Sequence, residues 1–537
     1  MKKLVLMLVL VLLAGMIAIA ALPADAAKEQ VMRGTTMEGG TYMDWMKTVY
    51  NRAGNPDVIQ MPISTYDNNF ELHPVAAESW SVSEDGLTWT FKLRPGMKWS
   101  DGTPLTAKDY VFALERAVTQ GYDFAWYWSW AGGVKNWGAV ESGELPLAEF
   151  GVKAVDDITI TVETTDPKPY FPGVAAFWFP VPKHAVDKYG DEYATKAETL
   201  PCSGPFMVTQ WVKGDRIVLE KNPHYIGPWQ PMLERIILYP SLDNPEVAFP
   251  AFLAGDIDGT ALNVGQLAFA SRRFPELMRP NALFQVYYLA FDYEKPPFND
   301  ANVRKALFYA VNRDEVTSTI LKDVAVPART LCSPGFPGYS EEIASQTGFN
   351  PTLAKEYLAK AGYPDGKGFP KVDLWYRIEG GYHAPIVKPL AEYLQAQFKK
   401  ILGIDIGVKG MELKTWMDGL TSREHNFFLS PYMYDYVDAS NFFSIFQSGG
   451  RHNWNNAEYD ALVREANSLS EWAVREPLYI QAEQLIVDDA AAVYLVHALE
   501  NKLVAAYLKG PGQEANKYGL YPQSIYYTWC NTYIAKE

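Results

Sequence analysis

The sequence predicts a mixed α/β protein built from two or three lobes. A chain of 537 residues is too long for a single hydrophobic core. Hydrophobic residues make up 48% of the chain and charged residues 21%, which is the balance of a compact globular protein. Short runs with a period of two are interleaved with longer runs of helical periodicity, so strands and helices alternate along the chain.

The most informative stretch covers residues 71–120. Trp89, Phe91 and Leu93 alternate there with polar residues, a period of two that predicts a strand with one buried face. Pro95-Gly96 ends this strand and begins a turn.

A second turn and a helix follow in the same stretch. Asp101-Gly102 forms the turn, and Thr106 begins the helix as its N-cap, with Asp109 as an imperfect capping box. The whole unit is predicted to be a strand, a turn, a second strand and a helix. It contains no catalytic group.

This stretch also carries a family resemblance. AESW, followed by LTWTFKLRPGMKWSDGTPLTAKDYVFALERA, is similar to the signature of extracellular solute-binding proteins of family five, which deliver oligopeptides, dipeptides, nickel or oligosaccharides to ABC importers. SGPFMVTQWVKGDRIVLEKNPHYIG resembles the oligopeptide-binding branch of that family. The resemblance runs from about residue 70 to the C-terminus. It implies a large three-lobed periplasmic binding protein with mixed sheets, helices and a hinged two-part cleft, and it implies no enzyme activity.

The resemblance further implies a first lobe assembled from separate segments. The expected divisions are a signal peptide (1–26), lobe I (27–65, 199–287 and 503–537), lobe II (66–198) and lobe III (288–502).

The remaining elements are predicted from local patterns. Lys213-Gly214-Asp215 forms a hairpin turn, and Gly362 closes a helix. A helix after a proline-rich crossing has one apolar stripe, which consists of Val303, Leu307, Ala310 and Val311. From Ala457 the pattern is helical, and VYLVHALENKLV returns to strand.

The net charge and the N-terminal residues limit the expected location and partners of the protein. Residues 1–26 combine two lysines, an apolar run and Ala24-Asp25-Ala26, which predicts a Sec-type signal peptide cleaved before Ala27; the alternative is an uncleaved membrane anchor. No cysteine follows the apolar run, so a freely moving periplasmic monomer is expected. The net charge of −15 argues against nucleic acid as a partner.

The sequence contains no recognised enzyme or metal-site signature. The chain has no G-x-S-x-G, H-E-x-x-H or Walker A sequence, and its seven histidines are scattered singly. We therefore expect no catalytic residues, no metal site and no cofactor. Cys202, Cys332 and Cys530 lack zinc-site spacing, and we expect either one disulfide or three buried thiols.

The candidate ligand site lies in FFLSPYMYDYVDASNFFSIF, residues 427–446. It resembles the loop of oligopeptide receptors in which an aspartate followed by tyrosine pairs with the α-ammonium of a peptide, and Asp435-Tyr436 occupies that position. A desolvated ammonium requires a carboxylate partner, which explains the residue type. The alternative is that Asp435 caps a turn. Tyr432 and Tyr434 are included in the predicted site.

Other predicted site residues come from the resemblance. His383 and Arg423 lie in segments that resemble those binding the peptide carboxylate, for which the planar fork of arginine is suited. Glu38 and Gly40 lie in a segment that resembles the first-lobe edge beside an extended peptide.

Two residues depart from the family pattern, which weakens the peptide hypothesis and leaves a second ligand class open. Pro431-Tyr432 stands where the family often has Gly-Trp, and Leu413 stands where an aromatic residue is common. The rival ligand is an oligosaccharide, for which the aromatic cluster between Tyr122 and Trp130 could provide stacking faces; the other interpretation of that cluster is a packed lobe core. In either case the partners are the ligand and the transmembrane subunits of an ABC permease.

Overall fold

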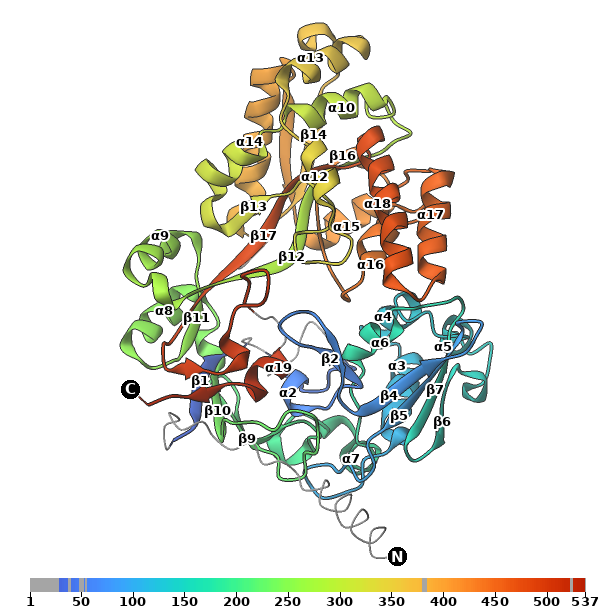
Figure 1. Cartoon of the computed structure of the whole chain (residues 1–537), viewed down its shortest axis with the longest axis vertical. Helices are drawn as coiled ribbons and strands as arrows, with labels where there is room; N and C mark the ends of the chain where they lie inside the picture. Colours follow the sequence, from blue (N-terminus) through green and yellow to red (C-terminus); the bar gives the residue numbers. More distant parts are fainter. Residues whose placement is uncertain are drawn as a thin grey trace, which may run out of the picture.

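The computed structural model describes residues 29–36, 40–47, 53, 56–378, 384–521 and 525–536. The predicted signal peptide, Glu38 and His383 lie outside these residues. The described chain forms a lower and an upper half, each with its own hydrophobic core (Figure 1).

One four-stranded sheet of the lower half combines distant segments. Its order is β1-β10-β9-β8, with β1 parallel to β10 and the other pairs antiparallel. The predicted Lys213-Gly214-Asp215 turn joins β8 to β9, and Gly214 has a φ of +76°, which a glycine adopts without strain. The strands are β1 (Val31–Thr35), β8 (Phe206–Val212), β9 (Arg216–Lys221) and β10 (Arg235–Tyr239).

A second four-stranded sheet of the lower half, in the order β4-β5-β7-β6, is antiparallel throughout. In β5 the predicted alternation is confirmed, because Trp89, Phe91 and Leu93 are buried and Lys92 is exposed. The sheet consists of β4 (Ala77–Val82), β5 (Thr88–Leu93), β6 (Val152–Asp156) and β7 (Thr159–Glu163).

The rest of the 71–120 unit differs in one respect from the prediction. Helix α3 (Ala107–Gln120) begins after Thr106, whose backbone N–H donates to Asp109 Oδ2 at 2.8 Å, so the predicted capping box is present. The predicted second strand is reduced to a single bridge between Lys98 and Pro104, because the two turns that flank it leave little room for a ladder.

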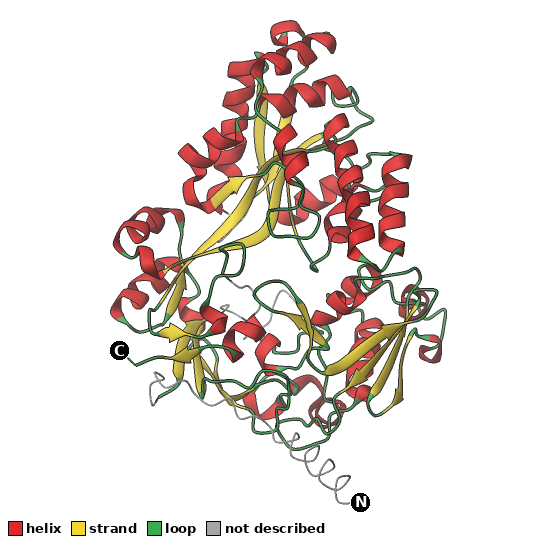
Figure 2. Cartoon of the chain, in the orientation of Figure 1, coloured by secondary structure: helices red, strands yellow, loops and turns green. Residues whose placement is uncertain are grey.

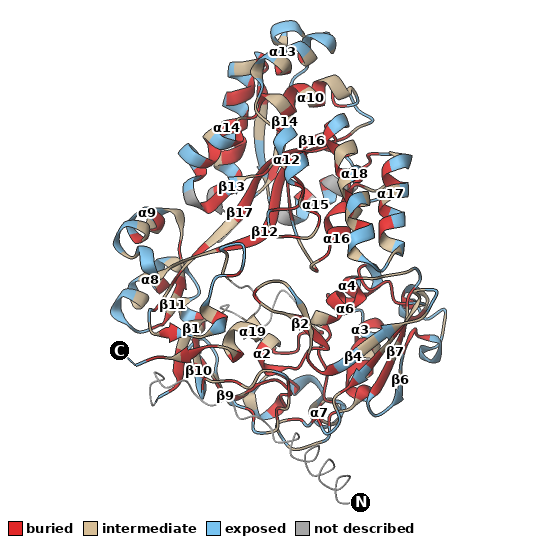
Figure 3. Ribbon diagram, in the orientation of Figure 1, coloured by how far each residue is buried: buried red, intermediate tan, exposed pale blue. Residues whose placement is uncertain are grey.

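The upper half is built on a seven-stranded mixed sheet. Six strands follow the order β11-β17-β12-β16-β14-β15, and β13 also pairs with β17. Helices surround this sheet, and their exposed faces point outward while the strands are mostly buried (Figures 2 and 3). The strands are β11 (Gly259–Ala261), β12 (Met278–Phe291), β13 (Ala325–Pro327), β14 (Val372–Arg377), β15 (Ile406–Met411), β16 (Phe427–Met433) and β17 (Val493–Val504).

The helices of the upper half follow the predicted patterns closely. The apolar stripe is buried on α10, although Val311 lies just beyond its end, and Gly362 follows α13 with a φ of +90°. The predicted final strand coincides with β17. The main helices are α10 (Ala301–Ala310), α13 (Pro351–Lys360), α14 (Ala384–Leu402), α15 (Leu413–Thr421), α16 (Ala439–Phe443), α17 (Ala457–Ser468) and α18 (Trp472–Asp489).

Two long antiparallel strands, β12 and β17, run from the upper sheet toward the lower half (Figure 1). The expected lobe divisions at 287/288 and 502/503 fall inside these strands, so the chain crosses between halves within regular structure. The register of β12 shifts between Ala282 and Val286, and Phe284 has a φ of +47° at this irregularity.

The three cysteines are buried free thiols, one of the two outcomes expected from the sequence. Cys202 and Cys530 belong to the lower core, and Cys332 belongs to the upper core. Among the described residues, none of the helices combines the length and the apolar character needed to cross a bilayer.

Candidate functional site

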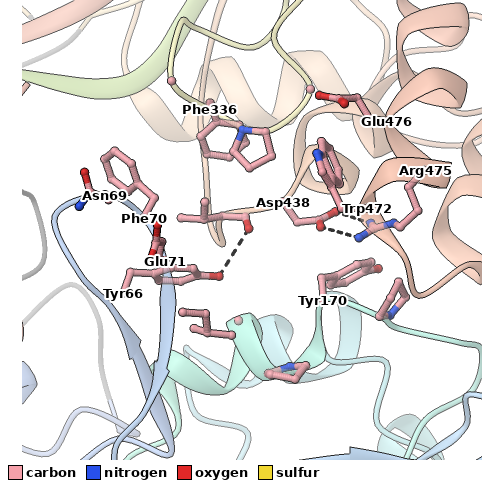
Figure 4. Close-up of a pocket in the computed structure, with 18 of the residues that line it drawn as sticks. Tyr66, Asn69, Phe70, Glu71, Tyr170, Phe336, Asp438, Trp472, Arg475 and Glu476 are labelled. Atoms are coloured by element: carbon pink, nitrogen blue, oxygen red, sulfur yellow. Dashed lines mark hydrogen bonds and ion pairs between the residues drawn. The ribbon is translucent and has the colours of Figure 1, made fainter. Parts of the chain in front are cut away.

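A cavity of about 620 Å³ lies between the two halves (Figure 4). From below it is lined by the β2–β3 hairpin (Ser64–Tyr66 and Leu72–Pro74) and by the segment around Tyr170. From above it is lined by the loop around Phe336 and by the start of α18. Because both halves contribute walls, a ligand held here contacts both and is sensitive to their relative position.

Asp438 and Arg475 form a buried ion pair on the upper wall of this cavity (Figure 4). Two bonds join them, from Arg475 Nη1 and Nη2 to the two carboxylate oxygens, at 2.9 and 2.7 Å. The carboxylate of Asp438 raises the pKa of Arg475, although burial acts in the opposite direction. Asp438 also accepts the N–H of Ser440 as the N-cap of α16, so the pair orders the loop that precedes the helix.

This loop, residues 434–438, reaches down to the lower half. The ring of Tyr436 stacks on Tyr170 with centroids 4.9 Å apart, and the hydroxyl of Tyr66 donates to the carbonyl of Val437 at 3.4 Å. A smaller cavity of about 110 Å³ lies against the loop and shares Tyr66 and Val437 with the larger one. The halves are thus already in contact at one side of the cavity.

Asp435 lies in this loop, half-buried, two residues after β16. Its Oδ2 accepts bonds from the hydroxyl of Tyr432 at 3.1 Å and from Asn441 Nδ2 at 3.3 Å. Burial raises the pKa of Asp435, whereas the bonds from Asn441 and Tyr432 and the charge of Arg451 lower it. The predicted alternative, a turn cap, describes Asp438 better, because that residue caps α16.

The edge of β16 next to Asp435 is open to a further strand. β14 pairs with β16 at Phe428 and Leu429, and among the described residues no strand continues along that edge. Pro431 lies opposite Tyr287 of β12, and because proline has no N–H, residue 431 cannot donate to a strand on either edge of β16.

The tyrosines predicted for the site are brought together around Asp435. Tyr432 bonds to Asp435, and Tyr434 and Tyr436 line the smaller cavity. One face of Tyr436 is already covered by Tyr170, so this ring belongs to the contact between the halves.

The other predicted residues are not brought to Asp435. Arg423 precedes β16 whereas Asp435 follows it, and a seven-residue strand spans roughly 20 Å. The guanidinium of Arg423 is half exposed and lies 3.9 Å from Glu294. Gly40 is half-buried in an irregular segment, and Glu38 and His383 lie outside the described residues.

Sequence reasoning missed most of the cavity wall. Asp438 and Arg475 are 37 positions apart, and the pair has no sequence signal beyond an aspartate before a helix. The aromatic residues Phe70, Phe284, Phe336 and Tyr434 come from four segments and meet with ring centroids 4.7 to 5.7 Å apart. A tertiary contact of this kind cannot be inferred from periodicity.

One cluster of metal-ligating residue types occurs among the described residues, namely Asp67, Glu71 and His73. Asp67 Oδ2 lies 3.0 Å from His73 Nε2, and Asp67 Oδ1 accepts the backbone N–H groups of Asn69 and Glu71. These hydrogen bonds close the β2–β3 hairpin, which explains why the three residues lie close together.

The aromatic cluster between Tyr122 and Trp130 is largely core, the second of its two interpretations. Phe124, Tyr127 and Trp128 are buried, whereas Trp126 and Trp130 are 43% and 41% exposed.

Comparisons with known proteins agree with this architecture. The model of the bacterial extracellular solute-binding proteins, family 5, matches residues 71–454. The chain is 33% identical to the probable deoxycholate-binding periplasmic protein YgiS of Escherichia coli K12 over 83% of each chain. It is 28% identical to the periplasmic oligopeptide-binding protein OppA of the same organism over 81% of each chain.

Among solved structures, the unliganded open form of the murein tripeptide-binding protein MppA has a TM-score of 0.81 at 25% identity and covers 96% of this chain and 99% of that one. A second structure of MppA, from Escherichia coli, scores 0.71 at 26% identity, with 96% and 100% covered. The relatives give the oligosaccharide alternative no support. The chain therefore belongs to the bacterial extracellular solute-binding proteins of family 5, which are substrate receptors and not enzymes.

Proposed function

We propose that this protein is the periplasmic receptor of an ABC importer and that it captures short peptides in the cleft between its halves. The observation that carries the proposal is the half-buried carboxylate of Asp435 beside the open edge of β16. OppA and MppA are named as peptide-binding proteins, and the cleft of this chain offers the two features that a peptide needs, a carboxylate for its ammonium and a strand edge for its main chain.

The chemistry of Asp435 favours an ammonium ligand. A carboxylate that burial has made less stable is stabilised when a cation enters and replaces lost water. Tyr432 and Asn441 hold the carboxylate in place through their bonds to Oδ2, so its position is set before the ligand arrives. Little of the binding free energy is therefore needed to reorganise the site.

Capture would proceed by closure about β12 and β17. These strands connect the halves, and the TM-score of 0.81 with the unliganded open form of MppA supports an open arrangement here. A ligand that contacts both walls of the cavity shifts the equilibrium toward the closed form. We propose that the transmembrane subunits of the permease recognise this closed form and that the receptor acts as a monomer exported by a signal peptide cleaved before Ala27.

We also propose the lobe division expected from the sequence, with 27–65, 199–287 and 503–537 forming lobe I. Its support is the sheet in which β1 pairs with β10 across that interval.

A bile salt is a second candidate ligand. The aromatic group of Phe70, Phe284, Phe336 and Tyr434 offers an apolar wall, and YgiS is named as a probable deoxycholate-binding protein. Against this candidate, a bile-salt carboxylate in the larger cavity would meet the carboxylates of Asp438 and Glu71. We therefore place peptides first.

A thermal-shift screen tests the proposal with short peptides, deoxycholate and oligosaccharides. One-site stabilisation grows with ligand excess and reaches about 2.7 kcal/mol at a hundredfold excess over Kd. We expect peptides to stabilise the protein and N-acetylated peptides to fail. Asp435→Ala should weaken peptide binding roughly thirtyfold or more, since loss of one partner of a buried charge pair costs about 2–5 kcal/mol. A response to deoxycholate alone would make the bile salt the ligand.

A further inference from the structure

We propose that the protein has a second ligand site, a cavity beside β12 and β17 that binds a small molecule with a carboxylate on an apolar body. This β12–β17 cavity has a volume of about 630 Å³ and is also lined by β1 of the lower half. It shares no lining residue with the larger cavity between the halves, and only Ile525 with the smaller one. The inference goes beyond the proposed function, because both the site and the ligand class differ from those of the peptide.

Two cations lie directly opposite each other at this cavity. Arg279 of β12 is the cross-strand partner of Lys502 of β17, and both residues line the cavity. Like charges in directly opposite positions destabilise a pair of strands. Lys502 has a carboxylate partner, Glu500, at 2.8 Å. Arg279 has none among the residues that the structure describes, and its Nη1 donates to the carbonyls of Glu276 and Met278. The partner that Arg279 lacks is an anion.

Three buried polar atoms of the residues that line the cavity have no hydrogen-bond partner in the described part of the chain. They are Arg279 Nε and Asn281 Oδ1 of β12 and Thr528 Oγ1 of α19 (Ile525–Cys530). A buried polar atom without a partner is costly, and a ligand that supplies the partner recovers that cost. Arg279 Nε and the Thr528 hydroxyl can donate to a carboxylate. Asn281, which is only 5% exposed, offers an acceptor for a ligand hydroxyl.

One face of α19 supplies an apolar wall. Ile525, Thr528 and Trp529 are spaced three and four positions apart from the first, so they share one helix face, and all three line the cavity. Leu238 and Leu283 also line it and are 1% and 6% exposed. Burial of apolar surface is favourable in proportion to its area. A ligand can therefore bury an apolar body here beside its charged group.

The unpaired charges at the β12–β17 cavity are positive. All three carboxylates that line it, Asp243, Asp258 and Glu500, have partners. Asp258 accepts the hydroxyl of Tyr507 and the backbone N–H of Arg33, each at 2.6 Å. The guanidinium of Arg33, in contrast, makes no hydrogen bond or ion pair with the residues that the structure describes. With Arg279 it makes two free cations, so the cavity favours an anion over a cation.

Titration calorimetry with four probes tests the inference: octanoate, its neutral amide, acetate, and deoxycholate below its micelle concentration. Octanamide keeps the apolar body and lacks the charge, whereas acetate keeps the charge and lacks the body. We expect the parent to bind octanoate at least tenfold more tightly than either of them. Arg279→Gln should bind octanoate and octanamide equally, and Arg279→Lys should restore part of the preference.

Lys502→Gln is a second variant, at a half-exposed side chain, and should lower the preference for octanoate over octanamide. Arg273→Gln is the matched control and should keep the full preference, because Arg273 is exposed, lies over the ring of Phe274 and does not line the cavity. Equal melting temperatures of the ligand-free variants show that the fold is intact.

Asn281→Leu distinguishes two sources of the carboxylate. If it weakens deoxycholate binding more than octanoate binding, the ligand carries hydroxyl groups, as a bile salt does; equal effects indicate a fatty acid.

The inference is overturned if the parent binds octanoate and octanamide alike, if Arg279→Gln and Lys502→Gln both keep the preference, or if Arg273→Gln abolishes it. The proposed function is judged separately: a parent that binds octanoate and no peptide contradicts only the proposed function, and one that binds peptide without preferring octanoate contradicts only the second site.

Discussion

The rings of Phe70 and Phe284 meet edge to face with centroids 4.7 Å apart, and both residues have positive φ, 63° and 47°. Phe70 belongs to the lower half, at the tip of the β2–β3 hairpin, and Phe284 lies at the register shift of β12. Bulky residues in this backbone region are strained, and surrounding contacts must hold them there. The pair therefore links the strand that connects the halves to the wall of the cavity.

We expect the two phenylalanines to be energetically coupled. In a double-mutant cycle of Phe70→Ala and Phe284→Ala, the free energy of unfolding should show a coupling of about 0.5–1.5 kcal/mol, as measured for aromatic pairs. Urea unfolding of the four proteins gives this value. The control pair is Phe249 and Phe269, whose rings make a similar edge-on contact with centroids 6.1 Å apart. Additive effects of the two substitutions would show that the Phe70–Phe284 contact contributes nothing specific.

Peptide affinity should depend on the ionisation of Asp435. Burial is the largest influence on this carboxyl and raises its pKa, so it becomes protonated at a higher pH than an exposed aspartate. Since an ammonium binds the carboxylate form, affinity should be full above that pKa and fall about tenfold per pH unit below it. Calorimetric titration between pH 4 and 8 measures this profile.

Asp435→Asn keeps the shape of the side chain and removes its charge. This variant should bind peptide weakly at every pH in the range, without the acid-dependent decrease. A parent profile that is flat down to pH 4 would contradict the raised pKa of Asp435 if Asp435→Asn binds more weakly, and would contradict its role as anchor if Asp435→Asn binds equally well.

Closure should be visible in solution as compaction. The present arrangement resembles an open form, with the halves in contact through residues 434–438 and joined by β12 and β17. We expect small-angle scattering to give a smaller radius of gyration with saturating peptide than without it. Asp435→Ala at the same peptide concentration is the control and should stay open. An unchanged radius for the parent at saturation would contradict closure.

Local patterns predicted the regular elements well, because they depend on neighbouring residues. The alternation of Trp89, Phe91 and Leu93, the Thr106 cap and the strand at 493–504 are properties of short segments. The proposed arrangement of lobes rests on the family signature, because no local pattern encodes it.

Only part of the candidate site can be predicted from the sequence, because most of its contacts join distant segments. Asp435 can be proposed from the sequence because it lies within a contiguous motif, whereas the Asp438–Arg475 pair and the Phe70–Phe284 contact join residues that only the tertiary fold brings together. Arg423 precedes β16 whereas Asp435 follows it, a separation that the sequence does not show because it gives a residue type without its place in the fold.

Glu483 gives the stability of the upper half a distinctive pH dependence. It is fully buried in α18, Oε1 accepts the N–H of Leu331 at 2.5 Å, and burial raises its pKa to about 8. An unfolded glutamate titrates near 4.3, so between that pH and about 8 the folded protein binds a proton that the unfolded chain has released. Stability from this group is therefore complete below the unfolded pKa and is lost as pH rises toward 8, by about 1.4 kcal/mol per pH unit.

The test is the substitution Glu483→Gln, which keeps the acceptor for Leu331 and removes the ionisation. We expect the parent to lose unfolding free energy between pH 5 and 8 and the variant to lose less over the same range, so that the variant becomes relatively more stable as pH rises. Urea unfolding at pH 5, 6.5 and 8 measures the difference. Glu356→Gln, at an exposed position of α13, is the matched control and should leave the slope of the parent unchanged. Parallel pH profiles for the parent and Glu483→Gln would mean that Glu483 is ionised in the folded protein, and that a partner within the upper core compensates its charge.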